Sequence, residues 1–183
     1  MASNLWFSSD HHFDHYNIIE YSSRPFKGVF EMNERLIELH NERVRPQDHW
    51  YCLGDFSMKR PRVVQHFLER MNGHKRLIRG NHDIFHTKEY IECGWEEIYG
   101  SRVLDNIIFT HIPIHPQSVG RFAANIHGHT HTQPDYPPVM RIAKDQKVSW
   151  CPYLNISVER TDYRPISLQE LKERIQKESH PNG

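Results

Sequence analysis

Residues 76–83 read Arg-Leu-Ile-Arg-Gly-Asn-His-Asp, and this stretch decides how the rest of the chain is interpreted. An apolar, strand-like segment ends at Gly80, and Asn81, His82 and Asp83 follow it without a spacer. A strand that ends in a tight turn can hold reactive side chains at the edge of a sheet. Gly-Asn is also an ordinary turn dipeptide, so the stretch alone is a weak signal.

Four other runs of Asp and His also follow apolar, strand-like segments. They are Asp10-His11-His12, Gly54-Asp55, Thr110-His111 and Gly128-His129-Thr130-His131. In extended backbone, residues two apart point to the same side of the chain. Asp10 and His12 are therefore expected to face one cation together. The pair His129 and His131 has the same spacing and is expected to lie on one side of the chain.

The strand-end side chains offer two carboxylates, one amide oxygen and five imidazoles: Asp10, His12, Asp55, Asn81, His82, His111, His129 and His131. This set is too large for one tetrahedral zinc and suits two cations that share a carboxylate. Two such cations can hold both oxygens of an in-line displacement at phosphorus. Imidazole and carboxylate without thiolate favour Mn, Fe, Zn, Co or Ni over Mg or Ca, and we expect Mn²⁺.

The amino-acid composition limits which folds and functions the chain can have. The 183 residues carry 23 Lys and Arg against 23 Asp and Glu, which gives no net basic field for a long nucleic acid. The length predicts one domain, residues 1–183. Fifteen histidines favour metal ligation or proton transfer. Three cysteines without a Cys-x-x-Cys pair indicate neither a disulfide framework nor a thiolate zinc site.

The sequence predicts a cytoplasmic protein with no membrane partner. Met1 to Asn4 lack the basic and apolar regions of a secretory signal. No apolar run approaches the roughly 20 residues that span a bilayer.

Apolar periodicity predicts an alternation of strands and helices. Helices are expected at 31–43, 61–71, 87–93 and from Ser167, which opens a capping box with Glu170. Strands are expected at 5–7, 50–53, 75–79, around Ile98, and at 102–104, 107–110, 125–127 and 150–158. Asp105-Asn106 predicts a hairpin turn. The class is therefore α/β or α+β, with the polar runs at the carboxyl ends of strands, where ligands bind in open sheets.

The order of the five polar runs resembles the calcineurin-like metallophosphoesterase superfamily. The flanking segments His15-Tyr16-Asn17-Ile18-Ile19 and Arg24-Pro25-Phe26 are similar to those of small, single-domain bacterial and phage phosphoesterases. The resemblance extends over nearly the whole chain. It implies a four-layer α/β/β/α sandwich of two mixed sheets flanked by helices, with a dinuclear metal site at the strand ends.

The resemblance also implies a role for each residue of the site. One metal would be held by Asp10, His12 and His131, and the other by Asn81, His111 and His129, with Asp55 bridging both. His82 would face the substrate, to stabilise the phosphoryl oxygens or protonate the leaving group. Asp83 would orient His82.

Histidines and arginines outside these runs have weaker signals. Arg24 is the preferred phosphate-binding residue, since guanidinium pairs bidentately with phosphate, although a surface salt bridge is the commoner fate of arginine. His15 is a candidate for contact with substrate. His127 is expected to be a buried, hydrogen-bonded core residue. His40 is expected at the solvated surface.

These observations predict a metal-dependent phosphoesterase that hydrolyses a small phosphodiester or phosphomonoester by attack of a metal-bridging hydroxide. One alternative is a nuclease or cyclic-nucleotide phosphodiesterase acting on short nucleic-acid substrates. The other is a non-catalytic, metal-stabilised interaction module. The physiological substrate, the native metal and the oligomeric state stay open.

Overall fold

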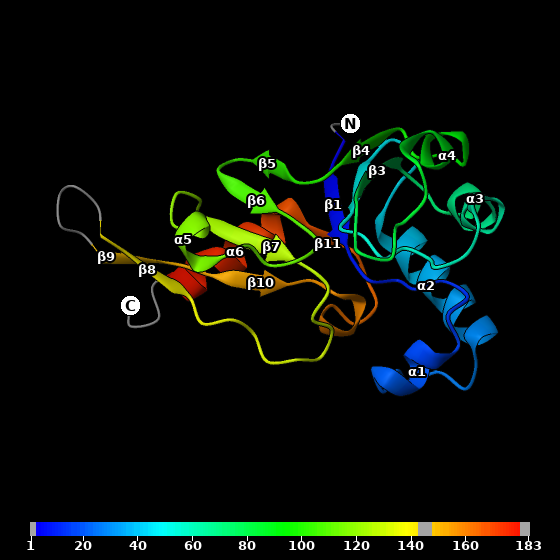
Figure 1. The fold of residues 1–183 in the computed structure, drawn as a ribbon, viewed down its shortest axis with the longest axis horizontal. Helices are drawn as coiled ribbons and strands as arrows, with labels where there is room; N and C mark the ends of the chain where they lie inside the picture. The colour runs from blue at the N-terminus through cyan, green and yellow to red at the C-terminus, as the bar shows by residue number, and fades with distance from the viewer. Residues whose placement is uncertain (1–2, 143–147, 180–183) are drawn as a thin grey trace.

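A five-stranded mixed sheet forms the centre of the computed structural model, which describes residues 3–142 and 148–179. Its strand order is β11-β1-β2-β3-β4 (Figure 1). The bounds are β1 (Leu5–Ser8), β2 (His49–Cys52), β3 (His74–Ile78), β4 (Glu97–Tyr99) and β11 (Ile166–Ser167). β1 to β4 are parallel and β11 is antiparallel to β1. The chain therefore leaves β1, β2 and β3 at the same edge of the sheet.

A second, four-stranded mixed sheet has the order β10-β7-β6-β5. Its strands are β5 (Arg102–Leu104), β6 (Ile107–Phe109), β7 (Ala124–His127) and β10 (Tyr153–Asn155). β5 and β6 form the predicted antiparallel hairpin, and Asp105 and Asn106 both have positive φ, 48° and 62°. Two such residues in succession match the twist of a two-residue hairpin loop. β6, β7 and β10 run parallel to one another.

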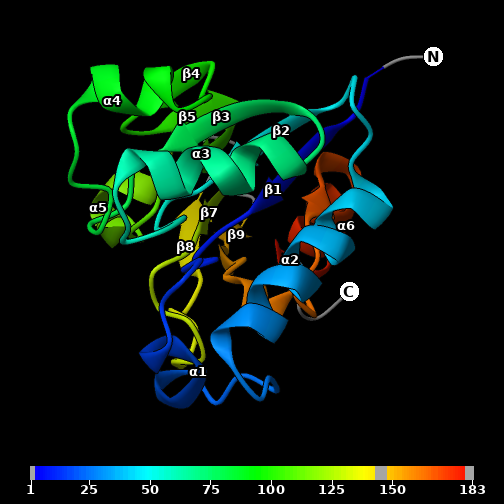
Figure 2. The same cartoon turned by 90° about the vertical axis from the view of Figure 1, so that its right-hand side faces the viewer.

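The two sheets pack against each other through apolar side chains. The rings of Phe7 and Phe109, one from each sheet, stack with centroids 4.4 Å apart. On the opposite face of the first sheet lie α2 (Val29–Arg43), α3 (Pro61–Arg70) and α4 (Thr87–Glu92) (Figure 2). Alternation along β2 serves both faces, because Trp50 packs with the helices and Tyr51 with the second sheet.

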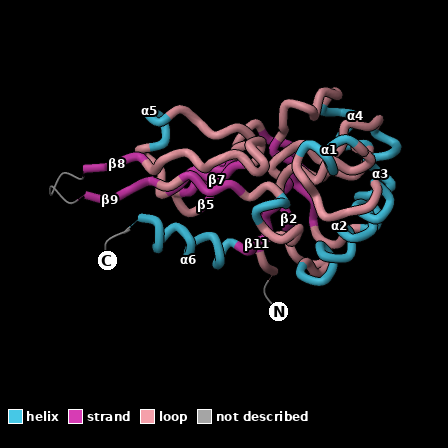
Figure 3. The backbone as a smooth tube through the Cα atoms, turned by 90° about the horizontal axis from the view of Figure 1, so that it is seen from below, coloured by secondary structure: helices cyan, strands magenta, loops and turns pink. Residues whose placement is uncertain are grey.

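The last helix, α6 (Leu168–Ser179), begins at the predicted capping box. Ser167 N donates to Glu170 Oε2 at 2.8 Å, and Glu170 N donates to Ser167 Oγ at 3.2 Å. α6 contacts β1, β11 and β9 (Val148–Cys151), and runs along the molecule towards the hairpin of β8 (Val139–Ile142) and β9 (Figure 3). The two mixed sheets and the helical layer outside the first are thus confirmed, while a complete fourth layer stays a prediction.

Some elements were not predicted. β8 (Val139–Ile142) pairs with β9 in an antiparallel hairpin at one end of the molecule (Figure 1). The strand expected at 150–158 is divided into β9, β10 and a 3₁₀ turn, Val158–Arg160. Pro152 lies at the first break and has no N–H for a sheet hydrogen bond. The short helices α1 (Asn17–Tyr21) and α5 (Pro116–Val119) are also additional.

The burial of His127 and His40 can be compared with the expectations from the sequence. His127 is fully buried, as expected, and its Nδ1 donates to Gly128 O at 2.8 Å. The expectation for His40 is wrong, because the side chain is buried against Trp50 with ring centroids 4.6 Å apart. Its Nε2 donates to Asn72 O at 2.9 Å, while its Nδ1 has no hydrogen-bond partner among the described residues. Among the described residues, none of the helices combines the length and apolar content needed to cross a bilayer.

Candidate metal centre

The loops that follow β1, β2 and β3 meet at the carboxyl edge of the first sheet. The chain beyond β1 continues to pair with the chain beyond β2: Asp10 N donates to Gly54 O at 3.0 Å, and His12 N to Asp55 O at 3.1 Å. Gly80, after β3, lies so close that a Cβ there would collide with the Asp55 carboxylate. Glycine at this position therefore allows the third loop to join the first two.

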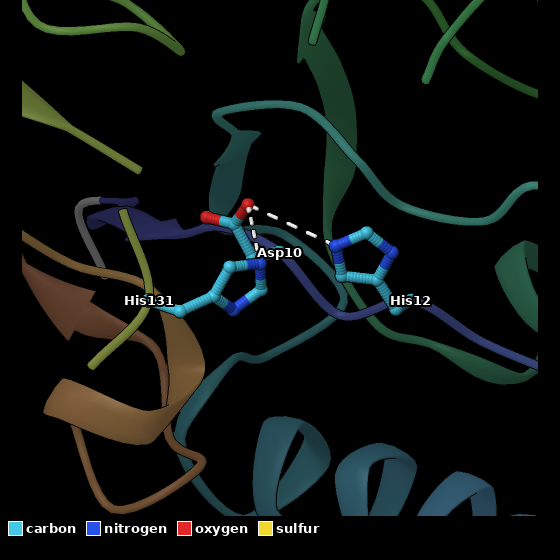
Figure 4. A group of neighbouring side chains, drawn as sticks. All are labelled: Asp10, His12 and His131. Carbon is cyan, nitrogen blue, oxygen red and sulfur yellow. Dashed lines mark ion pairs between the residues drawn. The ribbon is translucent and has the colours of Figure 1, made fainter. Parts of the chain in front are cut away.

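Asp10, His12 and His131 form a first ligand group, with ligand atoms that all lie within 4.8 Å of one another. Asp10 Oδ1 is 3.7 Å from His131 Nε2 and 4.0 Å from His12 Nε2 (Figure 4). Ligand atoms that share one cation at about 2.1 Å lie about 3 to 4 Å apart. The spacing of this group fits a single divalent ion.

The first ligand group contains buried polar atoms that lack a partner. Asp10 Oδ1 and both ring nitrogens of His12 have no hydrogen bond among the described residues. The other oxygen, Asp10 Oδ2, accepts from His129 N and from Ser157 Oγ, each at 2.9 Å. Leaving buried polar atoms unpaired costs free energy, and a cation at this position would satisfy them. The donor set thus fits a metal ion on chemical grounds.

Asp55, His111 and His129 form a second ligand group, also within 4.8 Å of one another. His111 Nδ1 donates to Leu53 O at 2.7 Å, which leaves Nε2 to point at Asp55 Oδ2, 3.3 Å away. The amide oxygen of Asn81 is 2.9 Å from the same Nε2. Fixing one ring nitrogen through a carbonyl is how proteins orient a histidine ligand.

Asp55 connects the two ligand groups. Its Oδ2 lies 3.8 Å from His12 Nε2, in the first group, and 3.3 Å from His111 Nε2, in the second. The same oxygen is 3.9 Å from His82 Nε2. Its Oδ1 accepts from the backbone N–H of His82 at 2.9 Å. Asp55 therefore lies between the two ligand groups and faces both of them.

The electrostatics of the two groups differ. Burial alone would raise the pKa of Asp55, but the hydrogen bond and charge of His111 lower it to about 2. Burial opposes the charged form of His111 as well, yet Asp55 and Asp10 raise the pKa of His111 to about 9. His12 has a pKa well below its usual value because it is buried, although Asp55 offsets part of that effect. His12 is therefore a neutral imidazole, the form that ligates metals.

The backbone at the candidate ligands is not extended. This corrects the assumption of extended backbone on which the expectation for residues two apart was based. Positive φ angles, between 45° and 68°, occur at Asp10, His12, Asp55, His129 and His131. Asp10 and His12 nevertheless lie in one ligand group, whereas His129 belongs to the second ligand group and His131 to the first. Left-handed backbone at non-glycine residues is strained and concentrates at functional sites.

The structure also corrects the role expected of Asp83. Its Oδ2 accepts from the backbone N–H of Gly80 at 2.8 Å and of Asp55 at 2.9 Å. Among the described contacts, none joins the Asp83 carboxylate to the His82 ring. Asp83 therefore holds the loops together, and His82, with a side chain 42% exposed, extends towards solvent beside Asp55.

Of the two expected substrate contacts, His15 lies at the site and Arg24 does not reach it. His15 lines the same pocket as His12 and His82. Arg24 is buried, and its guanidinium donates to Glu159 Oε1, to Asp10 O and to His11 O, at 2.7 to 2.9 Å. This arrangement does not support a contact between Arg24 and a substrate phosphate.

Three residues at and just after the end of β10 also support the site, and they were not among the predicted site residues. Glu159 Oε1 accepts from His131 Nδ1 at 3.0 Å, which directs Nε2 of that ring towards Asp10. Asn155 Nδ2 donates to His131 O at 2.8 Å, and Ser157 donates to Asp10. Asn155 ends β10, and Ser157 and Glu159 follow it. The strand expected at 150–158 enclosed Asn155 and Ser157, and only Glu159 follows the predicted strand end.

A cavity of about 520 Å³ opens beside both ligand groups. Its lining includes His12, His82, His129 and His131, together with apolar side chains from α1 and from the loop after β2. The volume lies within the usual range for small-molecule sites.

Comparison with known proteins identifies relatives for the whole chain. No family model matches the sequence. The uncharacterized protein MJ1445 of Methanocaldococcus jannaschii is 34% identical over 177 residues, covering 94% of this chain and 92% of that protein. The chain belongs to the family of this archaeal protein. The Gene 66 protein of Mycobacterium phage D29 is 38% identical over 84 residues, which is 44% of this chain and 41% of the phage protein.

Among solved structures, the protein of unknown function AQ665 from Aquifex aeolicus has the same fold. It superposes with a TM-score of 0.69 at 26% identity, over 94% of this chain and 100% of that chain. The nuclease MPE of Pseudomonas putida gives a TM-score of 0.48 at 19% identity, over 83% of this chain and 74% of that one. A likeness at that level carries no inference about activity.

Proposed function

We propose that this protein is a metal-dependent phosphoesterase that hydrolyses a small phosphodiester or phosphomonoester. The observation that carries the proposal is the position of Asp55 Oδ2, within 4 Å of ligand nitrogens from both ligand groups, 3.8 Å from His12 and 3.3 Å from His111. Two divalent cations bound there would polarise the phosphoryl oxygens and activate water. The proposal takes residues 1–183 as one domain and Mn²⁺ as the preferred metal.

The residues of the chain would divide the remaining work. Asp10, His12 and His131 would hold one cation, and Asn81, His111 and His129 would hold the other, with Asp55 shared by both groups. His82 is exposed on the same side as the pocket and can donate a proton or hydrogen bond to the ester oxygens. His15 contributes a further ring to the pocket.

Metal analysis and a substrate panel test this proposal. The protein is loaded with Mn²⁺ and assayed on generic diesters, monoesters, 2′,3′- and 3′,5′-cyclic nucleotides and short single-stranded DNA. We expect turnover that disappears when a chelator removes the metal. His82→Ala should keep bound metal and lose about 10²- to 10⁴-fold in kcat, the usual contribution of a general acid. Asp55→Ala should lose bound metal as well.

Two results would contradict the proposal. Full activity of metal-loaded His82→Ala on every substrate of the wild type would remove His82 from the chemistry. Stoichiometric metal without turnover on any phosphoester would favour the non-catalytic interaction module instead.

A further inference from the structure

The pocket beside the ligand groups has an apolar part that metal binding does not explain. Ile18 and Tyr21 of α1 line it, together with Met58 from the loop after β2. Tyr21 is 71% exposed and Met58 is 45% exposed. Large apolar side chains left in water beside a polar site mark a surface that a ligand covers.

A row of aromatic rings leads from the first ligand group to Tyr21. The His12 and His15 ring centroids are 5.5 Å apart, and the His15 and Tyr21 centroids are 6.3 Å apart with the rings edge to face. His15 N donates to His12 O at 3.1 Å, so the helix that carries Tyr21 starts directly from the chain that carries the ligand. A phosphorus atom held at the ligand groups would thus have Tyr21 within reach of its ester substituent.

The position of α1 is fixed from inside the protein. Ile18 is buried, and Arg24 N donates to Ile19 O at 2.8 Å just beyond the helix. The Arg24 guanidinium is held by Glu159 and by the backbone of Asp10. Figure 2 shows α1 at the same end of the molecule as the yellow loop after β7, which supplies Thr130 and Gln133 to the same pocket.

We infer that Tyr21, with Ile18 and Met58, binds a planar aromatic group on the phosphoester, so that the substrate belongs to the aromatic phosphoesters, of which nucleotides are the abundant natural class. This inference rests on the proposed function and specifies its substrate. A base or aryl ring can stack on Tyr21 or Met58 whatever its hydrogen-bonding pattern. The cavity of about 520 Å³ has room for a group of that size beside the phosphate.

Tyr16 offers a matched control for Tyr21. It lies directly before α1 and is 66% exposed, close to the exposure of Tyr21. Tyr16 does not belong to the pocket lining among the described residues, whereas Tyr21 does. A general effect of removing an exposed tyrosine near α1 would appear in both variants, while a stacking contact would appear in one.

Binding measurements test the inference without relying on turnover. The Mn²⁺-loaded protein is titrated separately with phenyl phosphate, adenosine 5′-monophosphate and methyl phosphate. Isothermal titration calorimetry measures the affinity for each ester. We expect the two aromatic esters to bind at least tenfold more tightly than methyl phosphate. Tyr21→Ala should weaken the aromatic esters about tenfold and leave methyl phosphate unchanged. Tyr21→Phe and Tyr16→Ala should keep the wild-type preference, and Met58→Ala, on a separate loop, should reduce it.

The outcomes separate this inference from the proposed function. Equal affinity of the wild type for phenyl and methyl phosphate, or no binding of any of the three esters, would overturn the inference. An equal loss in Tyr16→Ala and Tyr21→Ala would overturn it too. A protein that prefers aromatic esters in calorimetry but hydrolyses nothing in the substrate panel would refute the phosphoesterase and leave the aromatic subsite standing.

Discussion

Asp83 Oδ2 accepts a hydrogen bond from the backbone N–H of Asp55 at 2.9 Å and so joins the loop after β3 to the loop after β2. The same oxygen accepts from Gly80 N within its own loop. Asp83 is 2% exposed, and burial raises its pKa to about 6. A buried carboxylate with two backbone donors is a structural connection between the loops that carry Asp55 and Asn81.

Replacing Asp83 by alanine should destabilise the protein and release metal together. Asp83→Ala leaves the N–H groups of Gly80 and Asp55 without an acceptor, a loss of about 2 to 4 kcal/mol in the free energy of unfolding. Urea unfolding and metal content measure the two effects. Asp83→Asn, which keeps an acceptor oxygen, serves as the control. A loss of turnover alone, with stability and metal intact, would restore the idea that Asp83 acts through His82.

A methyl group at Gly80 should displace the Asp55 carboxylate. The added Cβ of Gly80→Ala would meet Asp55 Oδ1 and lie 2.7 Å from Asp55 N, so the loop after β2 must move. We expect most bound metal to be lost while the far-ultraviolet circular dichroism stays that of a folded chain. Gly100→Ala is the matched control, since a Cβ there has no atom within 4 Å among the described residues. Normal metal binding by Gly80→Ala would contradict the close approach of the two loops.

Glu159 should set the affinity of the first ligand group. Glu159→Gln removes the charge that both the His131 ring and the buried Arg24 guanidinium contact. Loss of such an outer partner typically weakens metal binding about 10- to 100-fold. The exposed pair of Arg160 and Asp135 provides the control, because Asp135→Asn should change neither metal affinity nor stability by much. Calorimetric titration with Mn²⁺ measures the difference, and unchanged affinity in Glu159→Gln would limit Glu159 to holding Arg24.

His40 should make stability fall in mild acid. Burial lowers the pKa of His40 from 6.5 to about 4, so the folded state resists its protonation. Its contribution is present above pH 6.5, where the unfolded chain is also neutral, and is lost as the pH falls towards 4. The loss should reach about 3 kcal/mol. Urea unfolding of wild type and His40→Leu between pH 7 and 4 checks this: the wild type should lose about 3 kcal/mol relative to His40→Leu over that range. Parallel curves would show that His40 is not the group responsible.

Local sequence predicted much of this protein. Short apolar runs located β1, β2 and β3, and the parallel pairing of these strands explains why the residues directly after them meet at one edge. The Ser167 and Glu170 capping box and the Asp105-Asn106 turn depend only on neighbouring residues, and both formed as expected. Such features can be predicted from the sequence because the interactions that form them join residues only a few positions apart.

Contacts between distant segments were decided by the tertiary structure. Left-handed backbone in the loop after β7 places His129 and His131 in different ligand groups. The family resemblance implied this division, but spacing along the chain does not reveal it. The Arg24 guanidinium is buried beside the carboxylate of Glu159, 135 residues away along the chain. A buried guanidinium requires such a partner, and the sequence near Arg24 does not show it. The sequence by itself thus determined which side chains stand at the strand ends, and the packing of separate loops determined what each of them touches.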